Sequence, residues 1–154
     1  MQSSKQIADY IVAFFHEHGD PVSNLKLQKL LYYAQAWSLA LYDTPLFEER
    51  IEAWVHGPVV PVAYGLYKGW AWQPICENID LLSLETPDKV VSHLNEIIDN
   101  YGGMSAYELE KLTHSEMPWQ NARKGIPLDQ PSNEVILHDD MRSFYRQVVN
   151  GKNP

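Results

Sequence analysis

The chain has 154 residues, of which 45% are hydrophobic and 12% aromatic, and its 20 acidic and 12 basic side chains give a formal net charge of −8. This composition is typical of a globular protein rather than a disordered one, and the length favours one domain spanning 1–154, with its core at about 3–149. The acidic balance argues against direct nucleic-acid binding, because affinity for phosphates comes from clustered lysine and arginine side chains.

Two helices are predicted at the start of the chain. The first follows a capping box formed by Ser3 and Gln6, carries an apolar stripe and ends before Gly19. The second, over 24–42, has Ser23 as its N-cap and is apolar on most of its sides. A helix of that kind is normally surrounded by other elements, so we expect it to lie at the centre of the fold.

A short strand is predicted after the second helix. Apolar and polar residues alternate over 50–56, which is typical of a half-buried strand. The alternation puts Glu52, Trp54 and His56 together on the side that faces away from the core. The strand is expected to end at Gly57, directly ahead of the next helix.

That next helix carries two prolines near its start. Pro58 and Pro61 are both expected in its first turn, where backbone N–H groups lack acceptors within the helix. The free N–H groups of Val59 and Val60 would then lie at the positive end of the helix dipole. We therefore expect this turn to be able to hold a carboxylate or another anion.

The remainder of the chain predicts further helices and a connecting segment. The residues 69–85 have no regular period and are expected to form an extended connection, with one short strand at most. Helical patterns follow at about 87–101 (capped by Thr86), after the capping box of Ser105 and Glu108, at 115–124 and at 139–149. The prediction is a mainly α, compact single-domain fold of about six helices with a small β element.

The sequence contains no pattern typical of a metal or cofactor site. It has six histidines but no His-Glu-x-x-His, Cys-x-x-Cys or phosphate-binding glycine loop, so neither a metal nor a cofactor is expected. The single cysteine, Cys76, excludes a disulfide framework and fits a reducing compartment. No stretch approaches the ~18–20 apolar residues of a membrane span, and no signal sequence is apparent, so we expect a cytoplasmic protein.

Two segments mix histidine, carboxylate and tryptophan. The first is 51–61, and the second is 113–120, which contains His114, Glu116 and Trp119. Three interpretations stay open for them: a cover for the edge of the core, a surface that binds a partner, or an acid–base active site.

Several runs of the sequence together resemble the Panacea domain, the SocA-like antitoxin family that includes phage-associated proteins. These runs are LQKLLYYAQAW at 27–37, PLF at 45–47, IEAWVHGPVVP at 51–61, Thr113-His114 and Pro118-Trp119. The similarity extends from about Ser3 to about Asn121, and more loosely to the last predicted helix. Because the first and third runs are specific to the family at this spacing, the chain is identified as resembling a Panacea domain.

The resemblance implies a binding protein rather than an enzyme. Panacea proteins resemble antitoxins that neutralise very different toxins encoded beside them, usually by direct contact, and a SocA-like member instead hands its toxin to a ClpXP-type protease. The family has no established catalytic residues, so the resemblance transfers none. Many relatives carry extra N-terminal domains, whereas the first predicted helix begins here at about Ser4, so we expect the bare domain.

Two hypotheses about function follow. In the first, the chain is an antitoxin or proteolytic adaptor that binds a cognate toxin through a face built around these side chains: Trp54, His56, Tyr64, His114, Trp119 and Arg123. In the second, it is a small enzyme of unknown substrate that uses His56 or His114 with Glu52 or Glu116.

Overall fold

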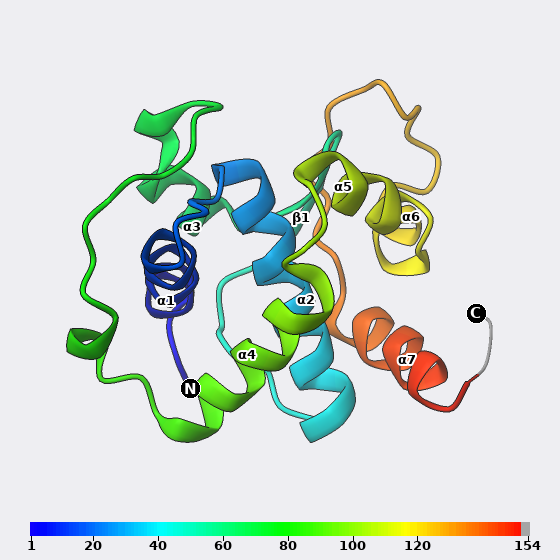
Figure 1. Cartoon of the computed structure of the whole chain (residues 1–154). Coiled ribbons are helices and arrows are strands. Elements are labelled where there is room, and N and C mark those ends of the chain that lie inside the picture. Colours follow the sequence, from blue (N-terminus) through cyan, green and yellow to red (C-terminus); the bar gives the residue numbers. More distant parts are fainter. Residues whose placement is uncertain (152–154) are drawn as a thin grey trace.

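The protein is built from helices around one small β-hairpin. The computed structural model describes residues 1–151, and within them it has seven α-helices and one two-stranded antiparallel sheet, which confirms the predicted mainly α fold (Figure 1). The elements in chain order are α1 (Ser4–Glu17), α2 (Asn24–Tyr42), β1 (Glu52–Trp54), β2 (Gly57–Val59), α3 (Pro61–Leu66), the 3₁₀ turns η1 (Lys68–Trp70) and η2 (Leu81–Leu84), α4 (Asp88–Tyr101), α5 (Ala106–His114), α6 (Met117–Ala122) and α7 (His138–Val149).

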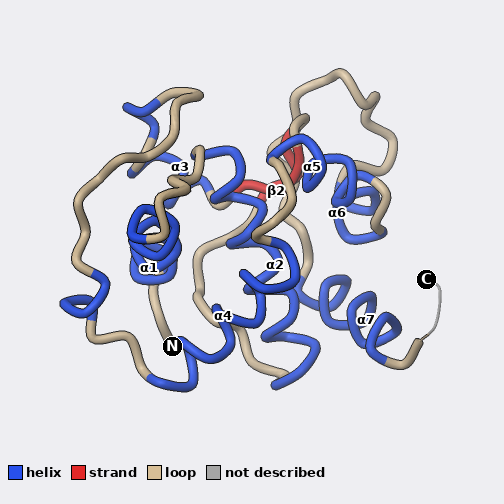
Figure 2. Tube along the Cα trace, in the orientation of Figure 1, coloured by secondary structure: helices blue, strands red, loops and turns tan. Residues whose placement is uncertain are grey.

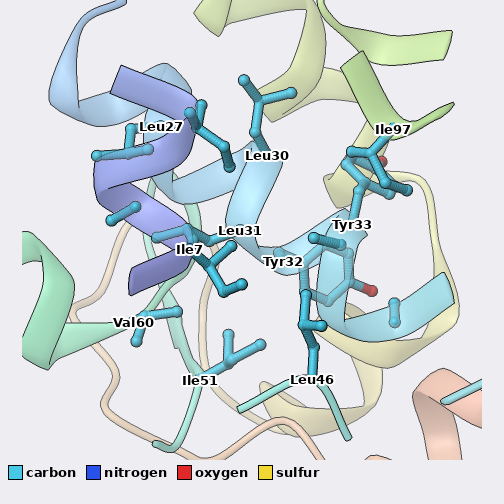
Figure 3. Packing of buried hydrophobic residues seen from close by; sticks show 14 of the residues in the cluster. Ile7, Leu27, Leu30, Leu31, Tyr32, Tyr33, Leu46, Ile51, Val60 and Ile97 are labelled. Atoms are coloured by element: carbon cyan, nitrogen blue, oxygen red, sulfur yellow. The ribbon is translucent and has the colours of Figure 1, made fainter. Parts of the chain in front are cut away.

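Helix α2 lies at the centre of the fold, as its apolar surface predicts. It contacts α1, α3, α4, α5, α7 and β2, and most of its side chains are buried. Figure 3 shows the core from close by, with Leu30 and Leu31 of α2, Ile7 of α1, and Ile51 and Val60 from the ends of the hairpin. Helix α6 packs on α5 and α7, which both touch α2, and every other helix touches α2 directly, so this helix positions the elements that carry the candidate site.

The predicted caps of α1, α2 and α5 are confirmed, and the predicted cap of α4 is wrong. The side chains of Ser3 and Gln6 form the capping box of α1, and the Ser23 hydroxyl caps α2. Thr86 does not cap α4, because Pro87 is itself the N-cap residue and has an extended backbone with ψ of 145°. The helix therefore begins one residue later than the proline rule predicts.

A two-stranded hairpin stands in place of the single strand predicted over 50–56, and its first strand is only three residues long. Strand β1 pairs antiparallel with β2, with Ala53 opposite Pro58, and the chain turns between them at Val55-His56. The segment 134–136 runs along the other side of β1, where the Ala53 N–H donates to the Glu134 carbonyl at 2.9 Å. In Figure 2 the two strands lie between α3 and α5.

The prediction that Pro58 starts a helix is wrong. Pro58 lies in β2, and α3 begins at Pro61 with Val60 as its N-cap residue. The Val60 N–H donates to Oε1 of Gln28 on α2 at 3.0 Å, and Val59 is paired with β1. The expected anion site is therefore wrong as well, because these backbone groups have partners inside the protein.

The helices predicted in the second half of the chain are present, but some of them begin or end at other residues than predicted. The connection 69–85 contains two 3₁₀ turns, and η2 packs against α1. An isolated bridge joins Ser23 to Pro74, where the connection passes the start of α2. Helix α6 is shorter than the predicted 115–124, and α7 begins one residue before the predicted 139–149.

Candidate functional site

A groove of about 600 Å³ opens beside the hairpin. Its walls come from the hairpin, the start of α2, helix α3 and the loop before α7. The lining residues are Leu25, Glu52, Trp54, Val55, His56, Val59, Tyr64, Pro131, Ser132 and Asn133. We call this feature the hairpin groove. Three of the six residues predicted to bind a partner line it, and they come from two different elements.

A buried carboxylate and two aromatic rings form one side of the hairpin groove. Glu52 is 6% exposed; its Oε2 accepts a hydrogen bond from Nε of Arg50 at 2.6 Å, and its Oε1 accepts one from the Trp54 indole at 2.9 Å. The Trp54 ring meets the Tyr64 ring edge-to-face, with 5.1 Å between the ring centroids. The prediction that Glu52 shares a strand face with Trp54 is confirmed, but this face is partly buried and not freely exposed.

The tip of the hairpin contacts α5 through a histidine and a carboxylate. Nδ1 of the exposed His56 lies 3.1 Å from Oε1 of Glu110. Below the turn, the fully buried Lys29 of α2 donates to the Pro58 carbonyl at 3.3 Å. Burial lowers the pKa of Lys29 to about 7, and the Glu110 carboxylate opposes this shift.

The second polar and aromatic segment packs directly against the first. His114 stacks on Trp119, with 3.9 Å between ring centroids, and the Trp119 indole donates to the Trp54 carbonyl at 2.9 Å. Burial lowers the pKa of His114, partly opposed by Glu110. The structure thus brings the segments 51–61 and 113–120 into one region.

Trp119 and Arg123, which were also predicted to bind a partner, are buried in the structure. They are 1% and 3% exposed, and the Arg123 guanidinium lies over the Trp119 ring at 5.1 Å. Arg123 donates to the carbonyls of Ala53 at 3.0 Å and Gln130 at 2.6 Å, so it joins β1 to the loop that borders the groove. Both residues support the groove from inside the protein, and the accessible part of the predicted face consists of the exposed His56 and the half-buried Trp54, Tyr64 and His114.

The histidine and carboxylate pairs of the enzyme hypothesis do not form in the described chain. His56 pairs with Glu110, whereas Glu52 pairs with Arg50. Glu116 faces the other way and accepts hydrogen bonds from two buried tyrosines of α2 and α7, and burial raises its pKa. Among residues 1–151, no three histidine, cysteine or acidic side chains are placed to hold a metal ion.

Polar residues of α2 support the site, and the sequence analysis missed them. Gln28 and Lys29 hold the backbone of the hairpin, as described above. Gln35 accepts a hydrogen bond from the Leu46 N–H at 2.7 Å and donates to the Phe47 carbonyl at 2.7 Å. The available signal was the presence of polar residues in an otherwise apolar helix, since buried polar groups need partners.

Comparisons with known proteins show the family of this chain. A family model described as "Antitoxin SocA-like, Panacea domain" matches residues 27–120, a range that runs from α2 into α6 and contains the hairpin. The chain belongs to this family. Trp54, His56, Tyr64 and His114 lie inside the matched range of the Panacea domain, and Arg123 lies outside it.

A relative of known name is similar over most of this range. Antitoxin SocA from Caulobacter vibrioides (strain NA1000 / CB15N) is 33% identical over 116 residues, which make up 68% of this chain and 62% of the relative. The aligned part of the chain thus spans less than two thirds of that relative's length. No solved structure is significantly similar to the chain. No helix between residues 1 and 151 combines the length and the apolar character that crossing a membrane requires.

Proposed function

We propose that this protein is an antitoxin that neutralises a toxin protein by binding it directly, through the surface formed by Trp54, His56, Tyr64 and His114. Membership of the SocA-like antitoxin family supports the general role, and the relative named Antitoxin SocA supports it further. The single observation that carries the choice of surface is the hairpin groove, an accessible hollow lined by aromatic side chains within the Panacea domain.

Neutralisation by contact requires no turnover. The antitoxin covers the working surface of the toxin, and a few aromatic anchors supply most of the affinity. Trp54 and Tyr64 are half-buried, and the Trp54 ring is oriented by its hydrogen bond to Glu52, so little freedom is lost when a partner covers it. The net charge of −8 favours encounter with a basic toxin in the cytoplasm.

Co-expression with the neighbouring reading frames tests this proposal. Each neighbour is expressed alone and with this chain, while growth and co-purification are measured. We expect one neighbour to be toxic alone, to be tolerated with the wild-type chain and to co-purify with it. If no neighbour is toxic, or if the toxic one is neither relieved nor bound by this chain, the proposed function is wrong.

A tryptophan variant tests the surface. Trp54→Ala should weaken toxin binding at least about tenfold, because it removes an aromatic anchor from the centre of the surface. The control is Trp72→Ala, since Trp72 is 82% exposed and lies outside the hairpin groove. Both variants should keep the native far-UV circular dichroism spectrum. Equal toxin binding by Trp54→Ala and the wild type would refute this surface.

The same cells distinguish contact from delivery to a protease. If contact alone neutralises the toxin, its level stays constant when the antitoxin is present. If the chain acts as an adaptor for a ClpXP-type protease, the toxin disappears in the presence of the antitoxin and returns when the protease gene is deleted. Both outcomes require the binding step, and the second adds a further partner.

A further inference from the structure

The hairpin groove pairs an apolar lining with one buried carboxylate. Among its ten lining residues, Glu52 carries the only formal charge when His56 is neutral. Its volume of about 600 Å³ falls in the range of roughly 300–1,000 Å³ that is typical of sites for small ligands and inserted side chains. An apolar hollow with a negative charge in its wall is complementary to a cationic group on an apolar stem.

The Glu52 carboxylate retains capacity to accept more hydrogen bonds. Each of its oxygens accepts one hydrogen bond within the described chain, from Arg50 or from Trp54. An ionised carboxylate has about four acceptor positions, so about half of them remain available. The cation that pairs with Glu52 in the described chain is Arg50, whose side chain is 57% exposed.

The aromatic pair beside this carboxylate suits a planar cation. The Trp54 and Tyr64 ring centroids are 5.1 Å apart, the rings are inclined by 63°, and both residues line the same hollow. A guanidinium group stacks on aromatic faces and donates hydrogen bonds in a fixed plane that fits a carboxylate. An ammonium group has no plane to stack, so the pair favours arginine over lysine.

We infer that the hairpin groove receives an arginine side chain of the partner protein, with the guanidinium stacked on Trp54 and hydrogen-bonded to Glu52. This inference rests on the proposed function for the identity of the partner, which is the toxin. It adds the chemistry by which the toxin is recognised. The overall acidic charge of the chain favours the approach of a basic segment.

A titration with a small probe tests the groove without the toxin. The full chain is labelled with ¹⁵N at its five tryptophan indoles, and the Trp54 signal is assigned by its loss in Trp54→Phe. Because this indole donates to Glu52, its signal reports on the carboxylate. N-acetyl-arginine amide should shift it in a saturable way, whereas N-acetyl-citrulline amide, which has a similar shape without the charge, should not.

Two variants sharpen this titration. Glu52→Gln keeps the size of the side chain and an acceptor for Trp54, and should abolish the response to the arginine probe. Arg50→Gln removes the competing cation and should strengthen binding of the probe several-fold. Equal responses to the arginine and citrulline probes, or no response to either, would overturn the inference.

The toxin supplies the second test. Glu52→Gln should lower toxin affinity at least tenfold, and the control Glu17→Gln, at an exposed carboxylate on α1, should leave it unchanged. If Glu52→Gln binds the toxin as tightly as the wild type does, the arginine contact is refuted, while the antitoxin function stands. If the wild type itself binds no toxin, the proposed function fails, and the probe titration still decides whether the groove takes arginine.

Discussion

Replacing the buried Lys29 with methionine should change how the stability of the protein depends on pH. Burial lowers the pKa of Lys29 in the folded chain to about 7, whereas unfolding restores the ordinary value of 10.5. Between these values the unfolded chain binds a proton that the folded chain does not bind. The free energy of unfolding of the wild type therefore rises with pH in this window, and Lys29→Met loses this contribution.

The size of the effect follows from proton linkage. A difference of one bound proton changes the free energy of unfolding by about 1.4 kcal/mol for each pH unit. Folded Lys29 is half protonated at pH 7 and almost fully deprotonated at pH 9, while the unfolded side chain stays protonated. The integrated gain for the wild type between pH 7 and pH 9 is about 2 kcal/mol.

Urea unfolding followed by tryptophan fluorescence at pH 7, 8 and 9 measures this gain. The quantity of interest is the difference between the wild type and Lys29→Met, in which the contributions of shared titrating groups cancel. This difference should rise by about 2 kcal/mol from pH 7 to pH 9. The control Lys89→Met, at an exposed lysine of α4, should show a constant difference. A constant difference for Lys29→Met would refute the assignment of a lowered pKa to this lysine.

Two further predictions concern the backbone and are checked by urea or thermal unfolding. Gly57→Ala should destabilise the protein by about 2–4 kcal/mol, because φ is +109° and the new methyl group would lie 2.5 Å from Cε of the buried Lys29. Its control Gly65→Ala, in α3 with open space around it, should be neutral or slightly stabilising, and equal losses for both would contradict this reasoning. Ala71→Gly should raise Tm with a gain of about 1 kcal/mol, because Ala71 has φ of 55° and ψ of −124°, a region that suits glycine, and a lower Tm would count against strain there.

The sequence predicted the helices well because helix signals are local. The capping boxes of α1 and α5 each involve two residues three positions apart, and their geometry forms as the pattern indicates. The apolar surface of α2 likewise predicted its central place, since a helix that is apolar on most sides must be covered. Such rules need no knowledge of distant residues.

The hairpin was mispredicted because distant residues decide it. A proline is acceptable both in the first turn of a helix and in a short strand, so Pro58 alone could not decide between them. The choice depends on Gln28, which lies 32 residues before Val60 and accepts its N–H, and on Lys29, which donates to the Pro58 carbonyl. Pairing of 134–136 with β1 adds a contact that is still more remote in sequence.

The sequence predicted which residues gather at the candidate site but not which of them are buried. The two mixed segments do meet, yet Trp119 and Arg123 are covered while Trp54 and His56 are accessible. Tryptophan and arginine are both enriched in protein interfaces, which is why the pair was expected at the surface. Arg123 is buried here because the loop after α6 folds back, and the Gln130 carbonyl accepts its hydrogen bond.

This arrangement explains how so small a hairpin can serve as a binding surface. Two strands of three residues would be only marginally stable alone in water. Here α2 holds one strand through Gln28 and Lys29, and α6 with its following residue holds the other through Trp119 and Arg123. Because these contacts fix the groove before any partner arrives, binding loses little conformational entropy. Substitutions at the covered residues should therefore weaken toxin binding by loosening the hairpin, whereas those at Trp54 should weaken it with the fold intact.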